Sequence, residues 1–292
     1  MKVLIAGAQG QLGWELQRTV PPHIECIAPE EKDFDITDPG IVDQTVAQWE
    51  PDVVVNAAAY TAVDKAEEEE NLAYRINADG AAHLARVSTE RKARLIHIST
   101  DFVFDGNQST PYLPTDTPSP LNVYGASKLK GEEEVAAITD GQALIFRTAW
   151  VYSVRGNNFV KTMLRLMAER QRISVVADQI GTPTWANELA KVIWQVFNRT
   201  DLSGIYHWTD AGVASWYDFA VAIQDEALAR GMLERPITVQ PIGTSDYPTQ
   251  AKRPPYSVLD KGATWAVLGY TGLHWRTALQ QMLKDLKEEH HA

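Results

Sequence analysis

The sequence predicts an α/β protein built on a Rossmann-like, doubly wound parallel sheet, with a smaller C-terminal lobe interwoven with it. Short apolar runs alternate with helical patterns over residues 1–150, as strands and crossover helices do. A glycine-rich turn follows the first run. After Trp150 prolines and aromatics cluster, and six of the nine tryptophans follow that residue. We therefore expect two units, residues 1–150 and 151–292, with a helix of about 186–198 packing back on the first.

Five apolar runs in the first unit predict strands buried on both faces of a parallel sheet, because half-exposed strands would alternate apolar and polar residues. Asp38 and Pro39 indicate a helix start before the third strand. The acidic run 67–70 is typical of a solvated first helical turn, and a long helical pattern follows it to about Arg91. The expected strands span residues 2–6, 24–28, 53–56, 95–99 and 143–147.

The later elements are less regular. A stretch with four prolines over 105–121 predicts a loop, and a helix follows it over 124–137. No internal repeat or low-complexity linker separates the two units. In the second unit we expect helices over 158–169 and 216–230 and short strands over 173–176 and 205–208.

Composition restricts the class of partner. A net charge of −11 disfavours nucleic acid and anionic membranes, which both reward a basic surface. Cys26 is the only cysteine, so no intrachain disulfide can form, which fits a reducing compartment. The histidines lack zinc-type spacing, and His97 within a strand fits a core residue. With no signal-peptide layout and no bilayer-spanning run, we expect a cytoplasmic protein with no membrane partner.

A glycine-rich segment directly follows the first expected strand. Gly7, Gly10 and Gly13 form the pattern G-x-x-G-x-x-G and open a helix. Such glycines let the backbone turn tightly and approach a pyrophosphate, which would bind free N–H groups at the positive helix end. The alternative is a structural turn in another kind of α/β protein. At the end of the third strand, Ala57-Ala58-Ala59 leaves room for a flat ligand, and tight packing explains those alanines equally well.

Tyr124 and Lys128 lie four residues apart, on one face of a predicted helix. The lysine charge would lower the tyrosine pKa toward working pH, so that the phenol can exchange a proton with a carbonyl or alcohol oxygen. Thr100 ends the fourth strand, on the sheet edge that carries the glycine turn. Together these groups would serve a nicotinamide cofactor. A solvated helix face explains the Tyr–Lys pair alone, and a cap or turn explains Thr100 alone.

These motifs resemble the extended short-chain dehydrogenases/reductases, and within them the dTDP-4-dehydrorhamnose reductase family. The resemblance covers the whole chain and implies reduction of the C4 ketone of a dTDP-sugar, the last step of dTDP-rhamnose synthesis. It implies NADPH or NADH as coenzyme and a monomer or homodimer. The similar stretches span residues 10–16, 56–64, 99–106, 120–128, 147–152 and 253–260.

The resemblance also implies a role for each matching residue. Thr100, Tyr124 and Lys128 would be catalytic, and Tyr124 and Lys128 would also contact the coenzyme. The other coenzyme-binding residues would be Gly7, Gly10, Gln11, Leu12, Gly13, Asp35, Ile36, Ala58, Ala59, Tyr60 and Thr61. Val63, Thr100, Asp101, Trp150 and Arg253 would bind the substrate, with Arg253 on its diphosphate. For Trp150 the alternative is a core tryptophan at a domain seam.

Related enzymes on the same fold supply the alternatives: another nucleotide-sugar ketoreductase, a 4-epimerase or a 4,6-dehydratase. Dehydratases of this superfamily carry a glutamate directly after Thr-Asp, where this chain has Phe102. A non-enzymatic regulatory subunit of the methionine adenosyltransferase type also resembles this family. Such a subunit has no reason to retain Thr100, Tyr124 and Lys128 together.

Coenzyme preference and metal binding stay open at this stage. Glu30 or Glu31 would favour NADH by binding the ribose hydroxyls, whereas Lys32 would meet the 2′-phosphate of NADPH. Some members of the family dimerise through Mg²⁺, for which Glu15 and Glu188 are the candidate ligands here. Two surface glutamates are more often solvated charges, so we assign no metal ligand.

Overall fold

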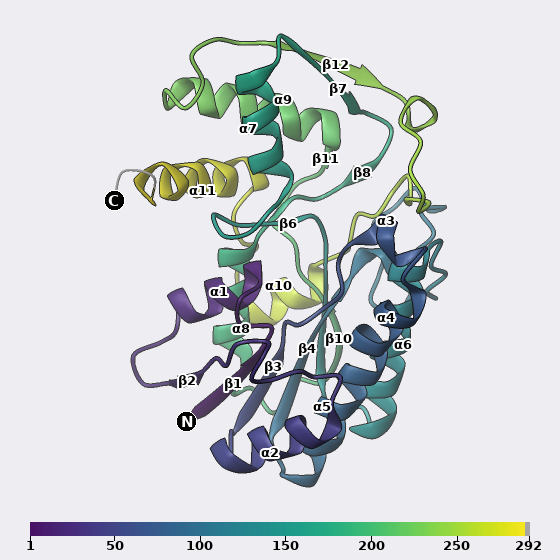
Figure 1. Cartoon of the computed structure of the whole chain (residues 1–292), viewed down its shortest axis with the longest axis vertical. Helices are drawn as coiled ribbons and strands as arrows, with labels where there is room; N and C mark the ends of the chain where they lie inside the picture. The colour runs from purple at the N-terminus through teal and green to yellow at the C-terminus, as the bar shows by residue number, and fades with distance from the viewer. Residues whose placement is uncertain (290–292) are drawn as a thin grey trace.

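The computed structural model describes residues 1–289, and a six-stranded sheet lies at its centre (Figure 1). The strand order is β10-β5-β4-β3-β1-β2, and every neighbouring pair is parallel. The order reverses between β1 and β3, so the carboxyl edge has a crevice there. The strands are β1 (Lys2–Ala6), β2 (Glu25–Ile27), β3 (Val53–Asn56), β4 (Arg94–Thr100), β5 (Leu144–Thr148) and β10 (Gly204–His207).

Helices cover both faces of this sheet, which explains its continuous apolar runs. On one face, α1 (Gln11–Arg18), α8 (Ala186–Val196) and α10 (Gly262–Leu268) pack on residues such as Val3 and Ile5. On the other face, α2 (Pro39–Trp49), α5 (Gly80–Glu90) and α6 (Val123–Ile138) pack on Leu4 and Ala6. Successive strand residues thus serve two different cores, as the sequence predicts.

A second core lies above the carboxyl edge of the sheet (Figure 1). It is formed by α7 (Phe159–Glu169), α9 (Trp216–Ala229) and α11 (Trp275–Glu289) around buried aromatics such as Trp185 and Phe219. Three small strand pairs frame it. They are β6 (Val151–Tyr152) with β9 (Thr184–Trp185), β8 (Ile180–Gly181) with β11 (Ala214–Ser215), and β7 (Arg172–Val176) with β12 (Thr238–Ile242).

The second half of the chain also completes the central sheet. β10 pairs with β5 in parallel register, and α8 covers one sheet face together with α1. The strand expected over 205–208 is therefore present one residue earlier, but as an edge strand of the main sheet. The division into residues 1–150 and 151–292 stays a prediction, and its last three residues lie outside the described part of the chain.

The segment after β3 agrees with its prediction at first and then departs from it. The run 67–70 is exposed and leads into α4 (Glu70–Tyr74), with Glu70 in the first helical turn, as predicted. Glu67 accepts a hydrogen bond from the Val123 backbone N–H at 2.9 Å, Glu68 accepts one from Gln250, and Glu69 accepts one from the Tyr60 hydroxyl. These side chains therefore brace three neighbouring segments. A π-helical turn, Arg75–Asp79 (η1), then interrupts the predicted long helix before α5.

Within residues 1–289, no helix is both long enough and apolar enough to cross a bilayer.

Candidate active site

The glycine turn lies against the end of β3, at the crevice of the sheet. Gly7 has a φ of +77°, and a Cβ there would stand 2.5 Å from the Ala58 backbone nitrogen. A Cβ at Gly13 would stand 2.2 Å from the Gly7 carbonyl oxygen. Gly10 caps α1 without any side-chain bond to the helix, so the first N–H groups remain open to a ligand. Only glycines allow this close approach, and the resulting cradle fits a pyrophosphate.

A cavity of about 290 Å³ opens beside this turn. Its wall combines backbone at the ends of β1 and β3 with the segment that follows β2. Of the residues predicted to bind a dinucleotide, the wall contains Gly7, Gly10, Asp35, Ile36, Ala58 and Ala59. The remaining predicted residues lie outside this wall: Gln11, Leu12 and Gly13 in the first turn of α1, Tyr60 and Thr61 in the chain after β3, and Tyr124 and Lys128 in α6. The cavity fits the adenosine half of a dinucleotide.

The sequence did not indicate several residues of that wall. Phe34, Leu72, Arg75 and Ile76 also line the cavity. Arg75 and Ile76 belong to the π-helical turn η1, whose position follows from packing between helices. No local pattern signals such a turn, so a single sequence could not assign these residues to the site.

The three predicted catalytic residues gather where β4 ends and α6 begins. Thr100 is the last residue of β4, and Tyr124 is in the first turn of α6. Asn122 caps that helix by accepting the Gly125 N–H at 2.8 Å. A Cβ at Gly125 would stand 2.2 Å from the Phe102 carbonyl oxygen, so the helix start lies directly on the turn after β4. Capping and a glycine contact thus bring Tyr124 beside Thr100.

Burial sets the protonation of this pair. It raises the pKa of Tyr124 to about 12, with a smaller opposing effect from the Thr100 hydroxyl. The prediction that the Tyr124 pKa lies nearer the working pH was therefore wrong, because burial dominates. Burial also lowers the pKa of Lys128 to about 8, and its Nζ donates to the Ile98 carbonyl of β4 at 2.6 Å. At neutral pH the phenol thus carries its proton, as a proton donor must.

Asp101, predicted to bind substrate, lies directly after Thr100. It is buried, which raises its pKa to about 6, and its Oδ1 accepts a hydrogen bond from the Thr100 hydroxyl at 3.1 Å. At neutral pH Asp101 thus carries more of the protonated form than an exposed aspartate would. The Thr100 hydroxyl also accepts the Phe102 N–H at 3.2 Å, so two contacts hold it in place.

Asn77 was not predicted, yet it links the site's loops. Its side chain donates to the Ser127 hydroxyl at 3.0 Å and to the Tyr60 carbonyl at 3.1 Å, and it accepts from the Tyr60 N–H at 2.9 Å. Ser127 in turn donates to the Tyr124 carbonyl at 2.8 Å. Asn77 lies in η1, and π-turns of this kind are frequent at functional sites. The bonds fix α6 against the chain after β3.

The predicted substrate residues occupy the rim above this edge. Val63 begins α3 (Val63–Ala66), and Arg253 forms a bidentate ion pair with Asp64 of the same helix. Trp150 stacks on Trp216 with ring centroids 3.5 Å apart, at the seam with the second core. Its φ of +46° is rare for a bulky residue. The structure therefore places Trp150 at the seam, and its role as a pocket wall stays a prediction.

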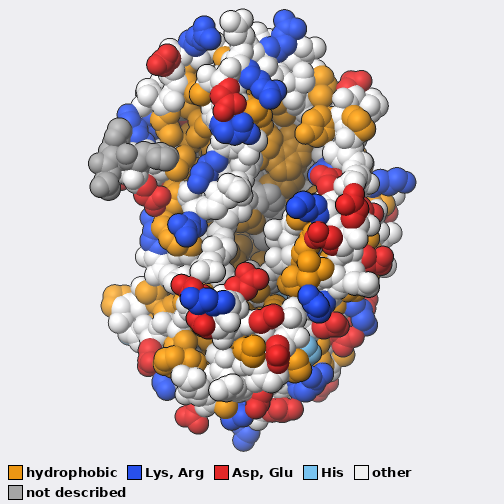
Figure 2. All heavy atoms as spheres, viewed as in Figure 1, with side chains coloured by type: hydrophobic (Ala, Val, Ile, Leu, Met, Phe, Trp, Pro, Cys, Tyr) orange, Lys and Arg blue, Asp and Glu red, His pale blue; other side chains and the backbone are white. Residues whose placement is uncertain are grey.

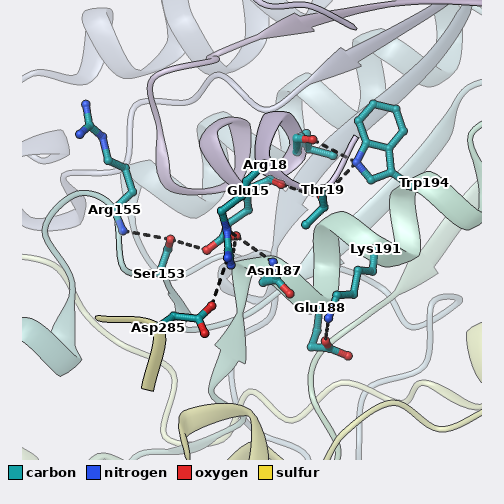
Figure 3. A network of polar contacts seen from close by, with 11 residues as sticks. Glu15, Arg18, Thr19, Ser153, Arg155, Asn187, Glu188, Lys191, Trp194 and Asp285 are labelled. Atoms are coloured by element: carbon teal, nitrogen blue, oxygen red, sulfur yellow. Dashed lines mark hydrogen bonds and ion pairs between the residues drawn. The ribbon is translucent and has the colours of Figure 1, made fainter. Parts of the chain in front are cut away.

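The two candidate magnesium ligands are not surface charges. Glu15 is fully buried and accepts hydrogen bonds from Ser153 at 2.8 Å, Asn187 at 2.9 Å and Arg18 at 3.0 Å (Figure 3). Glu188 is also buried, and its Oε1 pairs with Lys191 at 2.7 Å. The expectation of two solvated glutamates was wrong, because both carboxylates are buried, Glu15 in an internal network and Glu188 beneath its partner Lys191, which is exposed. Within residues 1–289, no group of three or more His, Cys, Asp or Glu side chains could hold a metal ion.

The face drawn in Figure 2 is hollowed between the sheet layer and the part that carries α7 and α9, and hydrophobic side chains line part of that hollow. The catalytic edge of the sheet faces the second core across this region (Figure 1). The hollow therefore lies between the carboxyl edge of the sheet and the second core.

Comparison with known proteins agrees with this geometry. A sequence profile described as the RmlD substrate binding domain matches residues 1–288. A dTDP-4-dehydrorhamnose reductase from Aggregatibacter actinomycetemcomitans is 42% identical over 288 residues, which cover 96% of this chain and 98% of that protein.

Two solved structures are similarly close. A dTDP-4-dehydrorhamnose reductase from Clostridium acetobutylicum has a TM-score of 0.92 at 41% identity, covering 98% of this chain and 100% of that one. One from Bacillus anthracis, solved in complex with NADP, has a TM-score of 0.89 at 39% identity, covering 97% and 99%. From the matched profile, the full-length relatives and the shared fold, we conclude that the chain belongs to the dTDP-4-dehydrorhamnose reductase family.

Proposed function

We propose that this chain reduces the C4 ketone of dTDP-4-dehydro-L-rhamnose to dTDP-L-rhamnose with NADPH or NADH. The observation that carries the proposal is the grouping of Thr100, Tyr124 and Lys128 on the sheet edge that bears the glycine turn. Family membership supports the sugar, since the matched relatives carry the reductase name. The reaction would be the last step of dTDP-rhamnose synthesis.

The coenzyme site fits the proposal. The cradle has no room for a Cβ at Gly7 or Gly13, and it presents N–H groups to a pyrophosphate. The adjoining cavity is large enough for an adenosine. Ala58 and Ala59 would contact the coenzyme beyond it. When bound, the reduced nicotinamide supplies the hydride that reaches the ketone carbon.

The chain's own residues would complete the reduction. Tyr124, which carries its proton at neutral pH, would donate it to the ketone oxygen as that oxygen gains negative charge. Thr100, whose hydroxyl proton is directed at Asp101 in this structure, would turn it to the same oxygen and stabilise the developing alkoxide. The Lys128 ammonium would stabilise the phenolate that remains. The ketone thus gains one hydride and one proton and becomes the alcohol.

The predicted residues at the rim of the site would select the substrate. Arg253 would bind the diphosphate, while Val63 and Trp150 would contact the sugar. The position after Asp101 holds Phe102, whose ring lies edge-on to Tyr124 with centroids 5.7 Å apart. An apolar ring there cannot serve as an acid or base, which disfavours a dehydratase.

The test is oxidation of NADPH, and separately of NADH, by protein supplied with dTDP-4-dehydro-L-rhamnose. We expect turnover that falls by about 10²- to 10⁴-fold in Tyr124→Phe, because the proton donor is lost. Tyr270→Phe is the matched control, since that tyrosine contacts Gln195 on the α8 side of the sheet. The ratio of the two coenzyme rates measures the preference between NADH and NADPH that Glu30 or Glu31 on one side and Lys32 on the other leave open.

Two outcomes would contradict the proposal. One is absence of oxidation with either coenzyme from protein that binds one of them. The other is full activity in Tyr124→Phe, which would assign proton donation to another group.

A further inference from the structure

A segment near the C-terminus crosses the substrate rim and is tied down at several points. We call residues 249–257 the C-terminal strap. The Gln250 side chain donates to Glu68, and the Asn122 side chain donates to the Lys252 carbonyl at 2.7 Å. Asn122 also caps α6, so the same side chain holds the strap and the helix start that carries Tyr124. The strap therefore has a fixed position relative to the catalytic helix.

Within the strap, Arg253 is gripped by Asp64 of α3. Its Nη2 lies 2.7 Å from Asp64 Oδ2, and its Nη1 lies 3.1 Å from Asp64 Oδ1. The Ala251 N–H donates to the same carboxylate at 3.2 Å. Hydrogen bonding from Arg253 lowers the pKa of Asp64, so this carboxyl group is ionised at neutral pH.

This grip uses only one edge of the guanidinium. A guanidinium has an end edge, formed by Nη1 and Nη2, and a side edge that includes Nε. Asp64 binds the end edge, and within residues 1–289 Nε has no hydrogen-bond partner. The Arg253 side chain is 24% exposed, so the guanidinium region is not fully enclosed by the protein. A second oxyanion can therefore bind Arg253 while the first stays in place.

We propose that Asp64 is a positioning residue, which holds Arg253 so that the free edge of its guanidinium receives the diphosphate of the nucleotide sugar. This inference rests on the diphosphate role of Arg253 in the proposed function. Asp64 itself does not touch the substrate. It holds the long Arg253 side chain in one orientation before the diphosphate binds, which reduces the conformational entropy that Arg253 loses on binding.

Simple electrostatics predicts the opposite effect of Asp64. A carboxylate near a diphosphate repels it, so removing the charge should strengthen anion binding. If Asp64 instead positions Arg253, removing the charge of Asp64 should weaken anion binding, because the guanidinium is released. The sign of the change in affinity therefore separates the two explanations.

The experiment measures dTDP affinity by calorimetry on the full chain saturated with NADPH. We expect Asp64→Asn to weaken dTDP binding by about tenfold, the equivalent of one charge-assisted hydrogen bond. Asp64→Glu should restore part of the affinity. In an Arg253→Gln background, Asp64→Asn should cause no further loss, because the residue that it positions is gone.

Glu68→Gln is the matched control. Glu68 bonds the same strap through Gln250 but does not contact Arg253. The amide oxygen of a glutamine can still accept this bond, so the substitution removes a local charge without freeing the strap or the guanidinium. We expect dTDP affinity in this variant to stay unchanged or rise slightly. In turnover assays, Asp64→Asn should raise the KM for the dTDP-sugar while kcat and the KM for NADPH stay near those of the unsubstituted chain.

Unchanged or tighter dTDP binding in Asp64→Asn would overturn the inference, and so would additive losses in the double variant. Failure of the unsubstituted chain to bind dTDP would overturn it as well. Because dTDP binding requires no turnover, a chain that binds dTDP but never oxidises coenzyme would refute the proposed reaction alone. Far-UV circular dichroism and thermal unfolding of each variant exclude loss of fold as the cause.

Discussion

At the scale of single residues, burial separates the protonation of Tyr124 and Lys128. The phenol, with its pKa at about 12, stays protonated over the whole working range, whereas the ammonium, with its pKa at about 8, does not. Of the two side chains, only Lys128 therefore changes its protonation state just above neutral pH. A phenolate left by proton transfer loses its stabilising cation as that charge disappears.

This predicts the pH dependence of the reduction. Below pH about 8 Lys128 is charged, and kcat/KM for the ketone should be level; above it, Lys128 loses its proton and kcat/KM should fall. The measurement is the pH profile of kcat/KM with saturating NADPH. In Lys128→Arg the cation persists, so the remaining activity should lose this alkaline decline. A level profile through pH about 9 in the unsubstituted chain would contradict the role of Lys128.

The same residues show where sequence reasoning succeeds and fails. Spacing and position relative to the strands were enough to bring Thr100 and Tyr124 together, because sheet topology fixes both. The direction of the Tyr124 pKa was wrong, because burial depends on packing from distant parts of the chain. Glu15 was misplaced for the same reason. Its partners Ser153 and Asn187 are 138 and 172 residues away, and no local pattern reports them.

At the scale of elements, Glu15 joins three segments: α1, the chain after β6 and the first turn of α8. Arg18 extends this junction to Asp285 of α11 at 3.1 Å (Figure 3). A buried carboxylate with several hydrogen-bond donors is costly to remove, because the donors are left without a partner.

We therefore expect Glu15→Ala to lower the free energy of unfolding by about 3 kcal/mol. The measurement is urea denaturation followed by circular dichroism. Glu169→Ala is the control, since Glu169 forms an exposed ion pair with Arg165 on α7, and its loss should cost under about 0.5 kcal/mol. Equal effects of the two substitutions would mean that the Glu15 contacts add no stability beyond a surface pair.

Elements differ in how far their sequence determines them. Strands β1 and β3 span the predicted residues, because a continuous apolar run buried on both faces is a strong local signal. The two-residue strands β6, β8, β9 and β11 are too short to leave any periodicity. The acidic run 67–70 is exposed, as its composition predicts, but its surface contacts with Tyr60, Val123 and Gln250 depend on the tertiary fold and leave no local pattern.

At the scale of the whole molecule, the two halves of the chain share one sheet. Residues 1–150 supply five strands, and the sixth comes from beyond that boundary, as does helix α8 on one sheet face. Without them, β5 would become an edge strand, and Leu144 and Phe146 would lose the cover that α8 supplies.

We accordingly expect a fragment of residues 1–150 not to fold independently. Urea titration followed by circular dichroism should show a broad, non-cooperative change, whereas the full chain under the same conditions should unfold cooperatively. A sharp transition in the fragment, with a slope that matches its size, would show that residue 150 is a true folding boundary.

The position of β10 also affects how the protein acquires its fold during synthesis. Between Thr148, where β5 ends, and Gly204, where β10 begins, 55 residues must leave the ribosome. At translation rates of about 5–20 residues per second, this takes roughly 3–11 s. During that interval the nascent chain exposes an open, apolar strand edge, which can pair with a neighbouring nascent chain. Ribosomes spaced closely on one messenger would present such edges to each other, so slower initiation or early chaperone engagement should raise the yield of folded protein.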